Sequence, residues 1–414
     1  MKKFFTKWFL FGMLIFMIVP GCLRVKKGSG APNIIFILTG DCPIQSISCY
    51  GNGLLHTPNI DRIYNEGIRF DSCFENRSFS LLSTMSEVLK NSDYKMYVVG
   101  KWDVYSLPSE IDYYSVLKGN GSYYHPDFIE DGNSISEKGY VTDIITKKAI
   151  TYINKRDKSK PFLMFYCNKA PLDKCEPAQR HLEVLNNKSI PYRHDISDIY
   201  YESYEQILKH VDQFVDIVQM KEVCSSTSEP FSEMTTNIIS ENKSHSEDLQ
   251  SWIQVSKTFH KKEYERMTDQ EKRNWDRIQK QRIEDFYSEP RNTEEQRIWI
   301  YRQFIKNYLS TIVAIDENIG RLISYLEKIN ELDNTIIVYT SDFFLDYSFK
   351  EKHDSKDIKG TCIPMLVRYP KKIKESSNSS QIIMNSDIIP FIMKLIDSDI
   401  KNNDQKIEQF NLHS

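Results

Sequence analysis

The chain has 414 residues, of which 40% are hydrophobic and 27% charged, and its formal net charge is -3. This is the composition of a globular protein that can bury a sizeable core, in one large domain or two. Because no positive field surrounds the whole chain, we exclude a nucleic-acid partner held by phosphate neutralisation, and any anion site must be local.

A short apolar run follows the lysines at the start of the chain. It covers residues 8–20 and closes on small residues. This arrangement is typical of a secretory signal, and the run is short for a helix that spans a membrane. We therefore expect a signal peptide over residues 1–22 and an exported protein, periplasmic or at the cell surface.

The last four residues of this segment, 19–22 (VPGC), resemble the bacterial lipoprotein box. In that box the cysteine is lipidated and becomes the mature N-terminus, so Cys22 would anchor the protein to a membrane. Proline before the glycine is atypical, which leaves plain cleavage and an uncleaved anchor as alternatives.

Five short apolar runs are each followed, directly or within a few residues, by glycine, aspartate or proline. They are rich in β-branched and aromatic residues. Continuous runs of this kind suit strands that are buried on both faces of a parallel sheet. The predicted strands are residues 33–38, 95–99, 162–166, 335–339 and 365–367.

One long amphipathic pattern predicts the main helix. From residue 294 to about residue 328, apolar side chains recur at three- and four-residue spacing, and Thr293 with Gln296 forms a candidate capping box. Strands that alternate with helices indicate an α/β fold with a mostly parallel sheet. Ligands of such folds bind beyond the carboxyl ends of the strands.

A polar stretch interrupts this pattern over about residues 222–292. Its first part is rich in serine and glutamate and predicts a mobile loop, whereas its second part is rich in lysine, arginine and glutamate and predicts a solvated helix. Residues 396–414 form a polar tail, so residues 31–395 are expected to hold the folded domain.

Two aspartates come just after two of the predicted strands. Asp41 follows the strand at 33–38, and Asp342 follows the strand at 335–339. Carboxylates that meet in one crevice repel each other unless a hard divalent cation neutralises them, so a shared calcium or magnesium site is one interpretation. The alternative is that each aspartate caps a following helix or turn.

A series of motifs resembles the sulfatase family in order and spacing. Four further stretches, 119–129, 139–146, 157–162 and 169–171, are similar to the bacterial branch of N-acetylglucosamine-6-sulfatases. The resemblance covers residues 31–395 without the polar insert. The family motifs are residues 31–41 (APNIIFILTGD), 49–51 (CYG), 56–62 (HTPNIDR), 66–70 (EGIRF), 100–102 (GKW) and 334–342 (NTIIVYTSD).

The resemblance implies an alkaline-phosphatase-like α/β fold, which is a three-layer sandwich around a mostly parallel central sheet. It also implies one calcium ion and a formylglycine, made from the cysteine or serine of a C/S-x-P-x-R motif, whose hydrated aldehyde attacks the sulfur of a sulfate ester. Sulfated carbohydrates such as glycosaminoglycans are the implied partners. The smaller C-terminal subdomain of the family is expected to be truncated here.

The implied calcium ligands are incomplete. The family has two adjacent aspartates after the first strand, and here Gly40 stands in the first position and Asp41 in the second. The late aspartate, Asp342, is followed by Phe343, where the family has an asparagine or glutamine. Phenylalanine offers no oxygen to a hard cation, so we expect calcium binding to be weak or lost.

The implied nucleophile is also altered. The resemblance assigns Ser80 to the formylglycine position, but Leu82 and Thr84 replace the proline and arginine that maturation needs. Formylglycine is therefore not expected, and Ser80 should remain a serine. Read without the family, Ser80 is a solvated turn serine.

The implied sulfate-binding set is reduced to a few cations. Lys101 alone is intact, with a surface lysine as the alternative interpretation. Lys169 is a candidate substrate-binding residue, and His353 is the candidate for the late cation together with Lys350 and Lys352. Residues that differ from the family are Asp103, Asn168 and Leu172, each at a position where a histidine is expected.

Three functions compete on this sequence. The first is a sulfatase-family protein that acts on sulfated glycans with little or no hydrolytic activity. The second is a non-catalytic binder of surface glycans that keeps the fold alone. The third uses Ser80 directly as the nucleophile of phosphoryl transfer, which needs metal ions that this site is poorly equipped to hold.

Overall fold

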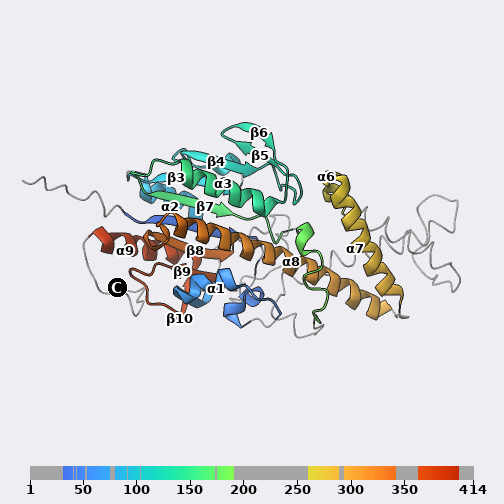
Figure 1. Ribbon diagram of the computed structural model, residues 1–414. Helices are drawn as coiled ribbons and strands as arrows, with labels where there is room; N and C mark the ends of the chain where they lie inside the picture. Colours follow the sequence, from blue (N-terminus) through green and yellow to red (C-terminus); the bar gives the residue numbers. More distant parts are fainter. Residues whose placement is uncertain are drawn as a thin grey trace, which may run out of the picture.

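The protein is built around a ten-stranded sheet (Figure 1). The computed structural model describes residues 31–40, 42, 44–51, 54–74, 80–90, 92–102, 104–172, 175–190, 260–288, 293–341 and 362–400. Within these residues the strand order is β10-β2-β9-β8-β1-β7-β3-β4-β5-β6. Consecutive strands of the chain are often not neighbours in the sheet, which is the signature of strands joined by crossover helices.

Most strands run in the same direction. The strands β8, β1, β7, β3 and β4 are parallel neighbours, whereas β9 pairs antiparallel with both β8 and β2, and β5 pairs antiparallel with both β4 and β6. The strands are β1 (Asn33–Thr39), β2 (Gly67–Phe74), β3 (Lys95–Gly100), β4 (Tyr113–Leu117), β5 (Asp127–Glu130), β6 (Asn133–Ser136), β7 (Phe162–Cys167), β8 (Thr335–Ser341), β9 (Cys362–Arg368) and β10 (Ser377–Met384).

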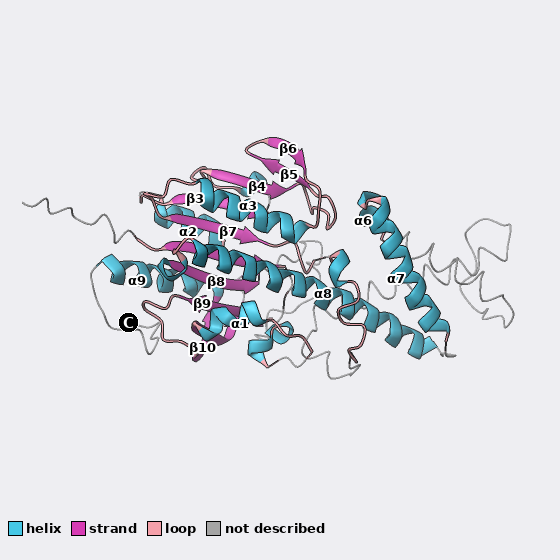
Figure 2. Ribbon diagram, viewed as in Figure 1, coloured by secondary structure: helices cyan, strands magenta, loops and turns pink. Residues whose placement is uncertain are grey.

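Helices cover both faces of the sheet, as Figure 2 shows. Alternate residues of β1 face opposite ways: Ile35 and Ile37 pack with one set of helices, and Ile34 and Phe36 with the other. The result is the predicted three-layer α/β sandwich. The first set is α1 (Pro58–Asn65), α3 (Val141–Lys155) and α8 (Thr293–Lys328), and the second is α2 (Leu81–Leu89) and α9 (Ile388–Ile400).

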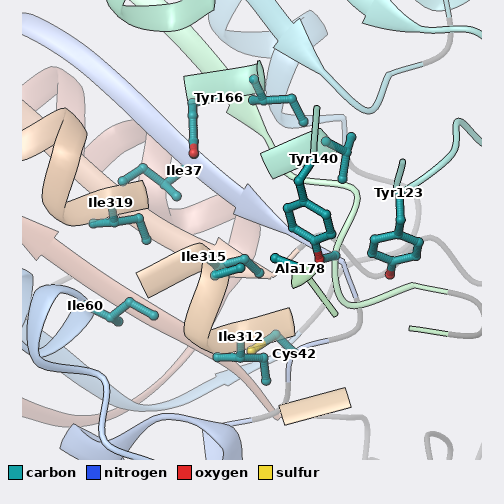
Figure 3. Packing of buried hydrophobic residues seen from close by; sticks show 14 of the residues in the cluster. Ile37, Cys42, Ile60, Tyr123, Tyr140, Tyr166, Ala178, Ile312, Ile315 and Ile319 are labelled. Atoms are coloured by element: carbon teal, nitrogen blue, oxygen red, sulfur yellow. The ribbon is translucent and has the colours of Figure 1, made fainter. Parts of the chain in front are cut away.

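The long helix α8 supplies much of the first core. Figure 3 shows Ile312, Ile315 and Ile319 of α8 with Ile37 of β1 in this core. Their spacing of three and four residues places the side chains on one face of the helix. The predicted helix from residue 294 to about 328 is therefore confirmed.

The five predicted strands are all present, as β1, β3, β7, β8 and β9. One expectation was wrong: β9 is antiparallel to its neighbours, although its sequence has the same continuous apolar character as the parallel strands. Strand direction is set by the connection that precedes the strand, and residues 342–361 of that connection lie outside the described part. The strands that were not predicted, such as β2 and β10, bury residues less regularly.

The charged insert also differs from its prediction. Its second part forms α6 (Lys261–Arg266) and α7 (Asp269–Tyr287), and a capping box of Thr268 and Glu271 begins α7. These helices are not solvated all round, because Trp275, Ile283 and Phe286 are buried in the core that α8 also lines. The expected loop over residues 222–248 lies outside the described residues.

Within the described residues, we find no helix that combines the length and the apolar character of a membrane span. The predicted signal peptide and Cys22 lie outside those residues, as does the polar tail beyond residue 400.

A buried carboxylate of α8 holds the start of α1. Asp316 accepts hydrogen bonds from the backbone N–H groups of Asn59 (2.9 Å) and Ile60 (2.8 Å) and from the Asn59 side chain (2.8 Å). Thr57, the residue that precedes α1, makes no side-chain cap of its own. Asp316 thus satisfies free donors at the first turn of α1 from a distant part of the sequence.

We expect Trp275→Ala to lower the free energy of unfolding by about 3–5 kcal/mol, because it removes a fully buried indole. Denaturant unfolding measures this change. The matched control is Lys280→Ala on the exposed side of α7, which should change stability by less than about 0.5 kcal/mol. Equal small effects would mean that α7 is the solvated helix that its composition predicted.

Asp316 also gives stability a dependence on pH. Burial raises the pKa of Asp316 to about 6, against the three hydrogen bonds that favour the carboxylate. The folded protein then binds more protons than the unfolded chain between about pH 4 and pH 6, so the contribution of this group is present at low pH and is lost as the pH rises. The Tm of the parent relative to that of Asp316→Asn should therefore fall from pH 4.5 to pH 7. A relative Tm of the parent that rises over this range would contradict the raised pKa.

Candidate functional site

The carboxyl ends of four neighbouring strands meet at one edge of the sheet. In the paired registers, Leu38 of β1 lies opposite Cys167 of β7, Cys167 lies opposite Gly100 of β3, and Thr39 lies opposite Ser341 of β8. Loops that follow these strands therefore start side by side. This edge is where an α/β sheet binds its ligands.

The loops after β1 and β8 are joined by a serine. The Ser341 hydroxyl donates to the Gly40 carbonyl at 2.6 Å and accepts from the Cys42 N–H at 3.1 Å. Asp41 and Asp342 themselves lie outside the described residues. Their chain neighbours are in contact here, and the prediction that the two aspartates share one crevice stays a prediction.

Position 40 does not fit a second carboxylate. The Gly40 N–H donates to the Ala170 carbonyl at 3.1 Å, and a Cβ atom on Gly40 would lie 2.7 Å from Leu172 Cγ and 3.0 Å from the Pro171 carbonyl oxygen. Leu172 thus fills the space that an aspartate at this position needs. The described residues also contain no group of three or more acidic, histidine or cysteine side chains suited to a metal ion. The steric conflict concerns one ligand position of the implied calcium set, and weak or lost calcium binding stays a prediction.

Lys101 lies at the tip of β3. Its backbone N–H donates to the Cys167 carbonyl at 2.9 Å, and its ammonium donates to Asn120 Oδ1 at 3.5 Å. The preceding Gly100 has φ +109°, and a Cβ atom there would lie 1.8 Å from the Cys167 carbonyl oxygen. Glycine is therefore required for β3 and β7 to end this close together, and it fixes the start of the lysine-bearing loop.

Lys169 lies two residues beyond β7 and is only 1% exposed. Its ammonium is 4.8 Å from the centroid of the Tyr123 ring, within the range of a cation–π interaction. The Tyr123 hydroxyl donates to the Leu172 carbonyl at 2.7 Å and accepts from the Leu172 N–H at 3.1 Å. The structure brings Lys101 and Lys169 to the same edge, but it packs Lys169 beneath an aromatic ring.

Sequence reasoning missed the part played by residues 119–125 at this edge. This loop supplies Asn120, which contacts Lys101, and Tyr123, which covers Lys169. Figure 3 shows Tyr123 next to Tyr140, which begins α3. The available signal was the glycine-rich and aromatic stretch GNGSYYH within the motif at residues 119–129, but nothing in its pattern indicates which strand ends it touches.

Two buried oxygens at this edge have no hydrogen-bond partner in the described part of the chain. They are Asn168 Oδ1, just beyond β7, and Thr340 Oγ1, near the end of β8. Asn168 stands where the family pattern has a histidine, and its amide N–H₂ donates to the Leu38 carbonyl at 3.3 Å. Its carbonyl oxygen remains an acceptor rather than a donor to an anion.

Ser80 is the N-cap residue of α2 and is exposed. Its hydroxyl accepts from the Ser83 N–H at 3.3 Å and donates to Ser83 Oγ at 3.0 Å, while its carbonyl accepts from the Thr84 hydroxyl at 2.8 Å. These are the contacts of a helix-capping serine. Among the described contacts of Ser80, none reaches Lys101 or Lys169.

The remaining candidates cannot be placed. Asp103, Phe343, Lys350, Lys352 and His353 lie outside the described residues, so their predicted roles stay predictions.

The packing of Gly40 against Leu172 makes a quantitative prediction. Gly40→Ala should destabilise the protein by about 1–3 kcal/mol because its methyl group meets Leu172. Adding Leu172→Ala should recover part of that loss, with a coupling of about 0.5–3 kcal/mol in a double-mutant cycle of unfolding free energies. Strictly additive effects would show that the two positions do not compete for space. Gly40→Asp alone should behave like Gly40→Ala.

Comparison with known proteins extends the motif resemblance to the whole domain. A family model described as Sulfatase matches residues 235–398. An N-acetylglucosamine-6-O-sulfatase of Bacteroides thetaiotaomicron is 38% identical over 402 residues, which cover 88% of this chain and 68% of that protein. An ulvan-active sulfatase of Formosa agariphila is 23% identical, over 89% of this chain and 54% of its own length.

A solved structure agrees with the sequence relatives. It is that of a protein in complex with its substrate, D-glucosamine-2-N,6-O-disulfate, and it matches with a TM-score of 0.67 and 33% identity over 91% of this chain and 79% of that one. The order of the motifs, the mostly parallel sheet between two helix layers and these matches lead to one conclusion. The chain belongs to the sulfatase family and has its alkaline-phosphatase-like α/β fold.

Proposed function

We propose that this protein binds sulfated glucosamine units of glycans at the carboxyl edge of its sheet and hydrolyses their sulfate esters weakly or not at all. The observation that carries the proposal is the position of Lys101 and Lys169 just beyond the ends of two paired strands, where one loop contacts both side chains. Lys101 can donate to a sulfate group, and the buried Lys169 adds positive charge at the same edge. The solved relative with a glucosamine disulfate as its substrate supports the choice of sugar.

Weak hydrolysis follows from the groups that catalysis needs. An efficient sulfatase of this family combines a formylglycine nucleophile with a calcium ion, and each supports the other in the transition state. Here Ser80 lacks the maturation motif and caps its own helix, while Leu172 takes the space of a carboxylate beside Asp41. Loss of a single preorganised donor typically costs about 10²–10³ in turnover.

The local hydrogen bonds of Ser80 also count against direct phosphoryl transfer. That reaction needs a free nucleophilic oxygen and metal ions that neutralise the phosphate. The Ser80 hydroxyl is instead engaged with Ser83 of its own helix. Glycan binding is therefore favoured over this alternative.

The proposal predicts binding without efficient turnover. Calorimetric titration with D-glucosamine-2-N,6-O-disulfate, with calcium in excess, should show binding that unsulfated glucosamine does not give. Lys101→Met should weaken it by about tenfold, the worth of one charge-assisted hydrogen bond. Lys147→Met, at an exposed position of α3, is the matched control and should have no effect.

Sulfate release and peptide mass are measured on the same protein. We expect release close to the uncatalysed rate and an unmodified serine at position 80. Absence of binding to the disulfated sugar would defeat the proposed glycan site. Rapid sulfate release, or the mass of an aldehyde at Ser80, would instead restore the reading of an active sulfatase.

A further inference from the structure

A short helix from the charged insert supports the loop that carries Tyr123. Glu263 of α6 accepts the backbone N–H groups of Tyr123 at 2.8 Å and Tyr124 at 3.1 Å through one carboxylate oxygen. Lys262 donates to the Gly121 carbonyl at 2.8 Å, and Arg266 donates to the Tyr124 carbonyl at 3.1 Å. Three residues of α6 therefore fix the backbone of residues 121–124 at the site edge.

Glu263 also lies in the electrostatic field of Lys169. Both residues are buried and both engage Tyr123, the lysine through the face of its ring and the glutamate through its backbone N–H. Burial raises the pKa of Glu263, as does the nearby Glu176 carboxylate, whereas the Tyr124 N–H and the Lys169 ammonium lower it. A buried ammonium and a buried carboxylate in this relation offset each other's charge.

A second carboxylate of this region, that of Glu176, is already paired. Glu176 accepts a hydrogen bond from His260 Nδ1, and His260 packs edge-on against Trp275. Among the described contacts, Glu263 is a carboxylate that both meets the Tyr123 loop and acts on Lys169.

We infer that Glu263 is a positioning and specificity residue of the sulfated-glycan site, where it offsets the charge of Lys169 and holds Tyr123 over it. The inference rests on the proposed function, because it assumes that the strand edge receives a sulfate group. A lysine whose positive charge is cancelled by a nearby carboxylate attracts a free inorganic anion only weakly. Together with Glu263, Lys169 should therefore add little to the affinity for inorganic sulfate. A sulfated sugar adds contacts from its ring and its hydroxyl groups, and the site then selects the sugar over the free ion.

The test is a cycle of Glu263→Gln, Lys169→Met and the double variant, titrated with inorganic sulfate at constant ionic strength. Glutamine keeps an oxygen that can accept the two backbone N–H groups and removes the charge. Without that charge, Glu263→Gln should bind sulfate about three- to thirtyfold more tightly than the parent, which is the Coulomb energy of unit charges roughly 8–12 Å apart at an effective dielectric constant of about 20–40. The double variant should lose this gain. Lys169→Met alone should weaken sulfate binding, because it removes the cation and leaves the buried Glu263 carboxylate unopposed.

A matched control separates this effect from the support that the helices give. Glu271 of the same helical pair accepts the Thr268 N–H and contacts His125, so Glu271→Gln makes the same charge change away from the Tyr123 N–H. It should leave sulfate binding unchanged. A purely structural role of Glu263 would alter the Tm of Glu263→Gln without tightening sulfate binding, and that result would overturn the inference. Tighter sulfate binding that persists in the double variant would also overturn the inference.

The outcomes also separate this inference from the proposed function. A parent that fails to bind the disulfated glucosamine, with a Glu263→Gln variant that still gains sulfate affinity through Lys169, would defeat the glycan proposal and leave the charge offset standing. If the parent binds the sugar but Glu263→Gln does not bind sulfate more tightly, the glycan proposal stands and the charge offset by Glu263 is defeated.

Discussion

Parallel pairing of β1 with β7 on one side and β8 on the other is the constraint on which the site depends. It places the ends of three strands at one level, and β3 adds a fourth through its pairing with β7. Residues more than 300 positions apart, such as Gly40 and Ser341, then lie within hydrogen-bond distance. The apolar side chains that bury both faces of β1 hold this arrangement, so the chemistry at the edge rests on the core beneath it.

Tyr123 connects the separate parts of the edge. Its hydroxyl holds the backbone of Leu172, its ring covers Lys169, and its N–H is held by Glu263 from α6. The charged insert therefore reaches the site through a small number of buried polar contacts, while Trp275 and its neighbours fix the insert in the core. A segment with the composition of a solvated helix is in this way part of both the folded core and the candidate binding site.

The departures from the family pattern are physically linked. Position 40 lacks the carboxylate of the family pattern, and position 172 lacks its histidine. These two differences in sequence affect the same space, because Leu172 packs where an aspartate at position 40 would stand. Restoration of one ligand therefore meets a steric cost before it can bring back any electrostatic gain.

The sequence alone determined the α/β class, five of the strands, the long helix α8 and the cations that lie at the strand tips. These follow from local apolar runs and periodicity, and from family motifs that are continuous in the chain. The direction of β9, the buried face of α7, the contact of Leu172 with Gly40 and the offset of Lys169 by Glu263 were decided by the tertiary structure. Each depends on contacts between segments far apart in sequence, and such contacts leave no periodic pattern in the residues that make them.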